Sequence, residues 1–191
     1  MRKTMARTVT ILIIIIASVT VGYFYDKILT GIEKKSHPLA FVEIVEKYSE
    51  EYDVPREIIY SVINTESGFR SDAVSPGVGA IGLMQIMPET FEWIAMKLGE
   101  NPAEGLIYDP HTNIKYGTFL LKYLYREFES WDIAFAAYNA GLNRVKNNWL
   151  NNPEYIKDNK IVYIPIEETR NYIKKVNKNI EVYKRLYFNN K

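Results

Sequence analysis

One glutamate stands at a position where helix periodicity calls for an apolar residue. In the segment REIIYSVINTESGF, Ile59, Val62, Ile63 and Glu66 follow the i, i+3, i+4, i+7 spacing of one helix face. Three of the four are apolar, so Glu66 belongs to the stripe that faces the protein interior. Burial disfavours the ionised carboxylate and raises its pKa, which suits a general acid. The alternative is that the stripe ends at Ile63 and Glu66 is a solvated residue at the helix end.

A glycine-rich loop follows this helix. The segment SPGVGAIGLMQIMP, residues 75–88, contains three glycines, which let a backbone approach a ligand closely, and Gln85, which can both donate and accept hydrogen bonds. It lacks the Gly-Lys-Ser/Thr of a phosphate-binding loop, which argues against nucleotide binding. The alternative is a plain connection between two helices.

Two later segments place polar groups at helix ends. In AFAAYNAGLNRV, small residues allow close approach of a helix or a sugar ring, and Tyr138 and Asn139 add a phenol and an amide. A helix corner with a capping glycine explains the same composition. In PIEETRNYIKKV, Glu168 and Tyr172 are spaced i, i+4 and share a helix face. The carboxylates of that segment also suit a helix N-terminus without any catalytic role.

The elements that would position these residues are helices. Apolar spacing, prolines at helix starts and glycines after helix ends predict an all-α domain with very little strand. The run at 161–166 is extended because it contains Pro165. The predicted helices cover residues 41–51, 55–67, 88–98, 111–128, 131–140, 142–150 and 167–187.

The N-terminal segment has the composition of a membrane anchor. Arg2, Lys3 and Arg7 precede 18 uncharged residues at 8–25, which is long enough to span a bilayer. Positive charges before the apolar run predict a cytoplasmic N-terminus and an extracytoplasmic domain. The alternative is a cleaved signal peptide and a secreted protein. The predicted organisation is a cytoplasmic tail at 1–7, a transmembrane helix at 8–25, a stem at 26–39 and one domain at 40–191.

The composition excludes several classes of protein. The chain has 191 residues, 47% of them hydrophobic and 25% charged, which suits one globular domain with a short appendage. It contains no cysteine, so disulfides, thiolate metal sites and cysteine nucleophiles are excluded. With two histidines, a zinc site would need carboxylates to complete it, and the net charge of +1 argues against nucleic-acid binding.

Four motifs in order, ESGF, GLMQIMP, AYNAG and ETRNYIKKV, resemble the lytic transglycosylase SLT domain, a family related to goose-type lysozymes. The resemblance covers residues 40–187 and implies a lysozyme-like helical fold with a groove for glycan strands. It implies cleavage of the β-1,4 bond between N-acetylmuramic acid and N-acetylglucosamine in peptidoglycan. Glu66 matches the family's single catalytic acid, which protonates the glycosidic oxygen and then acts as base to form a 1,6-anhydro ring. The matching positions for substrate binding are Ser67, Gln85, Tyr138, Asn139, Glu168 and Tyr172.

The resemblance implies peptidoglycan glycan strands as a partner and no metal or organic cofactor. The N-terminal apolar run implies the cytoplasmic membrane as a second partner through residues 8–25. Further partners in the cell envelope stay open. Two other functions remain as alternatives. One is a lysozyme-type hydrolase, in which water replaces the C6 hydroxyl of the muramyl residue. The other is a membrane-anchored scaffold that binds glycan without cutting it; a half-buried acid that costs stability argues against such a scaffold.

Overall fold

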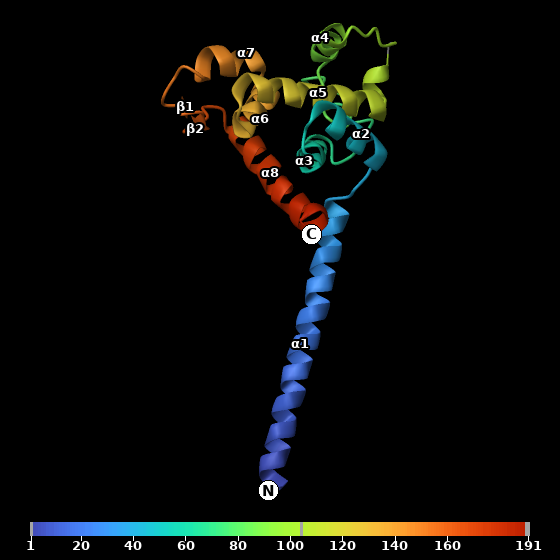
Figure 1. The fold of residues 1–191 in the computed structure, drawn as a ribbon, viewed down its shortest axis with the longest axis vertical. Helices are drawn as coiled ribbons and strands as arrows, with labels where there is room; N and C mark the ends of the chain where they lie inside the picture. Colours follow the sequence, from blue (N-terminus) through green and yellow to red (C-terminus); the bar gives the residue numbers. More distant parts are fainter. Residues whose placement is uncertain (1, 104, 190–191) are drawn as a thin grey trace. The chain divides into compact units, whose positions relative to one another are not determined.

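The computed structural model describes residues 2–103 and 105–189, and the chain divides into two compact units, Met1–Pro38 and Leu39–Lys191. The first unit is a single helix, α1 (Arg2–Ser36) (Figure 1). Within Ile11–Ser36 of this helix, an 18-residue window has a mean hydropathy of 1.8, so the helix is long and apolar enough to cross a membrane. The helix therefore also includes most of the segment that we expected to be a stem.

The second unit is helical, as the sequence predicted, with one short hairpin (Figure 1). Its helices are α2 (Val42–Tyr52), α3 (Arg56–Glu66), α4 (Pro88–Leu98), α5 (Pro110–Phe128), α6 (Trp131–Ala140), α7 (Leu142–Arg144) and α8 (Glu167–Tyr183). A 3₁₀ turn covers Leu106–Tyr108, and π-helical turns extend α7 and α8 over Val145–Trp149 and Lys184–Phe188. The predicted helix at 142–150 is thus an α-turn followed by a π-turn. The strands β1 (Ile156–Lys157) and β2 (Lys160–Ile161) pair antiparallel.

Local residue chemistry sets the ends of the helices around the site. Pro88 begins α4 at a position where its missing N–H has no cost, and Gly99 ends it in the left-handed conformation with φ 68°. Asp109 caps α5 by accepting a hydrogen bond from the Thr112 backbone N–H at 2.8 Å. These ends place the glycine-rich loop between α3 and α4, against the side of α5.

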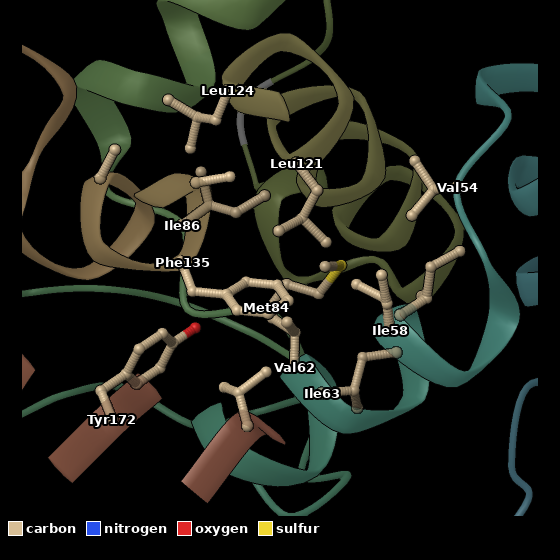
Figure 2. Packing of buried hydrophobic residues seen from close by; sticks show 14 of the residues in the cluster. Val54, Ile58, Val62, Ile63, Met84, Ile86, Leu121, Leu124, Phe135 and Tyr172 are labelled. Carbon is tan, nitrogen blue, oxygen red and sulfur yellow. The ribbon is translucent and has the colours of Figure 1, made fainter. Parts of the chain in front are cut away.

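The core lies where α5 contacts α2, α4 and α6, and where α8 packs on α3 and α6. Figure 2 shows apolar side chains of α3, α5, α6 and α8 in one cluster, with Met84 of the loop among them. Met84 is fully buried against Gly117, whose missing side chain leaves room for the methionine sulfur. Each such side chain contributes roughly 1.5–3 kcal/mol on burial. The loop after α3 is therefore fixed by the core.

Candidate active site

Glu66 is the last residue of α3, at the point where the chain turns into the glycine-rich loop. The helix stops because Gly68 adopts a left-handed conformation with φ 59°. Ser67 is buried, and its hydroxyl lies 2.8 Å from the Leu83 carbonyl oxygen and 3.2 Å from that of Ile63. A single hydroxyl proton serves these two acceptors. Ser67 therefore ties the end of α3 to the loop instead of facing a ligand.

The loop is held by a residue that the sequence analysis did not single out, Asn113 of α5. Its amide nitrogen donates to the carbonyl oxygens of Ile81 and Ile107 at 3.0 and 2.8 Å, and its oxygen accepts from the Met84 backbone N–H at 2.8 Å. A Cβ on Gly82 would lie 2.4 Å from the Asn113 amide nitrogen, and Gly82 has φ 80°. The sequence signal was present, since Asn113 lies one turn before Gly117 on the buried face of its helix.

Gln85 lies at the end of this loop with φ 47°. Its amide nitrogen donates to the carbonyl oxygens of Ala73 and Gly82 at 3.1 and 2.9 Å, which closes the loop on itself. Within the described part of the chain its carbonyl oxygen accepts no hydrogen bond, so that oxygen is the group left for a ligand. Gln85 is thus both a loop closure and a candidate acceptor.

Two tyrosines approach Glu66 from different helices. Tyr138, near the end of α6, donates its hydroxyl proton to the Met84 carbonyl oxygen at 2.7 Å. Tyr172 of α8 is buried and points toward the core (Figure 2). Burial, and then the negative charge of Glu66, hold the pKa of both phenols well above the ordinary value. Both phenols therefore stay protonated: Tyr138 donates to Met84, and the proton of Tyr172 is available to an acceptor.

The hydroxyl of Tyr172 is buried without a hydrogen-bond partner among the described residues. It is close enough to Glu66 to lower the pKa of that carboxyl, but no acceptor lies at full hydrogen-bonding geometry. An unpaired buried hydroxyl costs about 1–3 kcal/mol, and such groups in native structures call for an explanation. The explanation is that this hydroxyl donates a hydrogen bond only when a ligand is bound or when Glu66 is ionised.

Burial raises the pKa of Glu66 to about 7, although part of its side chain still reaches solvent. Desolvation by the surrounding protein is the main cause, and the negative charge of Glu168 adds to it. The Tyr172 hydroxyl and the positive charge of Lys175 act in the opposite direction. At neutral pH both the protonated and the ionised form are therefore populated, so the group can give and take a proton. The raised pKa expected from the helix stripe is confirmed.

Helix α8 fixes the last turn of α3 from the side. The Lys175 ammonium donates to the Thr65 carbonyl oxygen at 3.1 Å, and the Asn179 amide donates to the Thr65 hydroxyl at 2.9 Å. Thr169 donates to the side-chain oxygen of Asn139 at 2.7 Å, which ties α8 to the end of α6. Asn139 therefore serves a contact between helices, and the acid is positioned by residues more than 100 positions later in the chain.

Apart from Gln85, the residues predicted to accompany Glu66 divide into two groups. Tyr138, Tyr172 and Glu168 surround Glu66, with Glu168 exposed to solvent at the start of α8. Ser67 and Asn139 use their side chains within the protein. A cleft of about 370 Å³ next to Tyr138 is lined by residues of α4, α5, α6 and α7. An elongated ligand that lies in this cleft reaches Tyr138.

The transglycosylase SLT domain family model matches residues 43–161. The chain is 38% identical over 145 residues to the soluble lytic murein transglycosylase of Escherichia coli (strain K12), covering 73% of this chain and 22% of that protein. It is 28% identical over 161 residues to a membrane-bound lytic murein transglycosylase C of Haemophilus influenzae (strain PittGG), covering 72% of this chain and 45% of the relative.

Solved structures give the same result. The complex of the 70-kDa soluble lytic transglycosylase with bulgecin A has a TM-score of 0.73 and 35% identity, covering 83% of this chain and 26% of that one. The lytic transglycosylase Slt of Pseudomonas aeruginosa has a TM-score of 0.67 and 30% identity, covering 78% and 24%. The chain thus spans about a quarter or less of these longer soluble enzymes. With the family model matching more than half of its residues, the chain belongs to the transglycosylase SLT domain family.

Proposed function

We propose that this protein is a peptidoglycan lytic transglycosylase with Glu66 as its acid and base. The observation that carries the proposal is the raised pKa of Glu66, about 7, at a helix end that faces two protonated phenols. Most glycosidases use two carboxylates, one of them as acid. Here a single carboxyl that is half protonated near pH 7 can serve both steps in turn. The likeness to lytic murein transglycosylases supports the same substrate class.

In the first step Glu66 donates its proton to the oxygen of the β-1,4 bond between N-acetylmuramic acid and N-acetylglucosamine. The bond from that oxygen to C1 of the muramyl residue breaks, and the N-acetyl group of the substrate stabilises the positive charge at C1. In the second step the Glu66 carboxylate takes the proton of the C6 hydroxyl while O6 bonds to C1. This closes the 1,6-anhydro ring and regenerates the acid without consuming water.

The neighbours of Glu66 have distinct roles in this proposal. Tyr172 donates a hydrogen bond to the carboxylate formed after the first step, or to the substrate, because its hydroxyl has no partner among the described residues of the free protein. The free carbonyl oxygen of Gln85 accepts from the N-acetyl or hydroxyl groups of the sugar. Glu168 binds sugar hydroxyls at the open side of the site. Ser67, Asn139 and Tyr138 hold α3, α8 and the loop in register.

The test uses the full-length protein in detergent with purified peptidoglycan, followed by mass spectrometry of the released fragments. Products one water lighter than hydrolytic fragments, absent with Glu66→Gln, are expected. Products with free reducing ends would instead identify a lysozyme-type hydrolase. Retained binding without any product would identify a scaffold.

We also propose that the apolar part of α1 anchors the protein in the cytoplasmic membrane, with the N-terminus inside and residues 39–191 outside. The length and hydropathy of the helix support this, as do Arg2, Lys3 and Arg7 before it. Membrane fractionation followed by protease treatment of spheroplasts tests the proposal. A full-length protein in the membrane fraction with a protease-sensitive domain is expected, and a shortened protein in the medium would contradict it.

A further inference from the structure

One face of α5 carries an aromatic and charged surface that the proposed reaction does not use. Phe119, Lys122, Tyr123 and Arg126 follow the i, i+3, i+4, i+7 spacing of a single helix face. Arg126 is exposed, and the other three are partly exposed. The opposite face of the helix, with Ile114, is buried in the core. Phe119 and Tyr123 pack against the core with part of each ring, and the rest of this face is open to solvent.

The aromatic rings continue beyond α5 on both sides. The ring of Tyr52, at the end of α2, lies 5.8 Å from that of Phe119, which lies 6.4 Å from Tyr123. Tyr123 in turn lies 4.9 Å from Trp93 of α4. We call these four residues, Tyr52, Phe119, Tyr123 and Trp93, the aromatic strip. It crosses three helices without a break.

The strip connects two clefts, one of which reaches the candidate active site. A cleft of about 510 Å³ is lined by Tyr52, Phe119 and Tyr123. The cleft of about 370 Å³ next to the active site is lined by Tyr123, Trp93 and Tyr138. Tyr123 belongs to both, and Tyr138 lies next to Glu66. A long ligand that occupies the active site can thus continue along the strip.

The charges in the outer cleft are balanced. Lys122 and Arg126 are matched there by Glu51 and Asp53, and Lys122 pairs with Asp53 at 2.7 Å. A surface that binds a polyanion has an excess of positive charge, which this cleft does not have. Sugar hydroxyls both donate and accept hydrogen bonds, and the C–H faces of pyranose rings are apolar and pack against aromatic rings. The surface therefore fits an uncharged glycan backbone.

We propose that the aromatic strip is a secondary binding site for the glycan backbone of peptidoglycan, which keeps a long strand attached while Glu66 acts on one of its bonds. This inference rests on the proposed function, since it takes its ligand from it. It predicts that affinity depends on strand length, because a short oligosaccharide fills only the cleft beside Tyr138.

The test measures binding to full-length protein carrying Glu66→Gln, which prevents cleavage of the probe. The probes are fluorescently labelled peptide-free glycan strands, with the lactyl carboxyl of each muramyl residue converted to an amide so that the strand is uncharged, and a tetrasaccharide of the same repeat. Tyr52→Ser, which removes one ring of the strip, is expected to weaken binding of the strands by about five- to tenfold and to leave the tetrasaccharide unchanged. Tyr52→Phe keeps the ring and is expected to bind like the parent.

Two further variants test the outer cleft at a second position and provide a control outside the strip. Arg126→Ala changes an exposed residue that cannot disturb the core, and it is expected to weaken strand binding in the same direction as Tyr52→Ser. Tyr163→Ser removes an aromatic ring outside the strip, from a residue that is 51% exposed, and is expected to leave binding of the strands unchanged. Circular dichroism confirms that each variant is folded.

The outcomes separate the two proposals. Equal binding of long strands by the parent, Tyr52→Ser and Arg126→Ala would overturn the strip, whatever the protein cleaves. Strip-dependent binding with no cleavage by the protein that retains Glu66 would support the strip and refute the proposed activity. Binding that requires intact stem peptides would overturn the glycan ligand in favour of a peptide ligand.

Discussion

Substitution of Gly82 by alanine tests whether the loop beside Glu66 is held by Asn113. The new Cβ would lie 2.4 Å from the Asn113 amide nitrogen, and Gly82 has φ 80°, which L-residues rarely adopt. The backbone strain costs about 1–2 kcal/mol. Displacement of Asn113 loses up to three hydrogen bonds of about 0.5–1.5 kcal/mol each. The expected loss is therefore about 3–5 kcal/mol in the free energy of unfolding.

Gly77 offers a matched control, because it has the same φ of 80° but no neighbouring atom within 4 Å of the point where a Cβ would lie. Gly77→Ala should therefore cost only the strain, about 1–2 kcal/mol. In thermal unfolding this corresponds to a fall in Tm on the order of 10 °C for Gly82→Ala and about 4 °C for Gly77→Ala. Tryptophan fluorescence reports on the domain alone, because all three tryptophans follow residue 39. Equal shifts for the two variants would refute the role of Asn113.

Three further predictions concern Glu66 and its neighbours. Because a general acid must be protonated, kcat/KM should fall as the pH rises through about 7. Lys175→Met removes a positive charge that lowers the pKa of Glu66, so this fall in kcat/KM should move to higher pH. An unchanged pH profile in this variant would contradict the assignment of Glu66 as the acid. Tyr172→Phe should lower kcat at least tenfold and leave Tm unchanged or higher, because the hydroxyl it removes is buried without a partner among the described residues. A lower Tm with a normal kcat would mean that the hydroxyl stabilises the fold and does not take part in the reaction. Because the pKa of Glu66 is raised in the folded protein, the folded state loses stability as the pH rises from the ordinary carboxyl pKa through about 7. Glu66→Gln should therefore be more stable than the parent at pH 8, by up to about 3 kcal/mol, and should lose this advantage at pH 4. Urea unfolding at both pH values measures the difference, and an equal difference at pH 8 and pH 4 would count against the raised pKa.

The helices were predictable because each carries its own boundary residues. Pro88 and Gly99 bound α4 at the predicted residues, and Asp109 and Pro110 begin α5 within one residue of the prediction. The inward direction of the stripe that contains Glu66 was also predictable: Ile59, Val62 and Ile63 are buried, and a helix face depends only on spacing within one segment. Such local patterns predict structure within a few helical turns, and they do not predict contacts between residues that are distant in sequence.

Side-chain partners were not predictable where they lie far apart in sequence. The hydroxyl of Ser67 lies against Leu83 across the loop, and Asn139 pairs with Thr169 of another helix. Nothing within either segment distinguishes such a contact from a ligand contact. Asn113 could have been found by the argument used for Glu66, as a polar residue on a buried face, but its three partners depend on the tertiary fold.

The contacts of α8 with the end of α3 complete the candidate active site only at a late stage of folding. Lys175 and Asn179 reach Thr65 across 110 and 114 residues, so the loop between them must close before Glu66 acquires its final surroundings. A nascent chain that has emerged as far as α6 already contains the acid and Tyr138, but it lacks Tyr172, Lys175 and the helix that aligns them. Under the proposed function and topology, the order of synthesis therefore separates the presence of the acid from its activity: a chain that is crossing the membrane with Glu66 exposed cannot cut until its last helix docks.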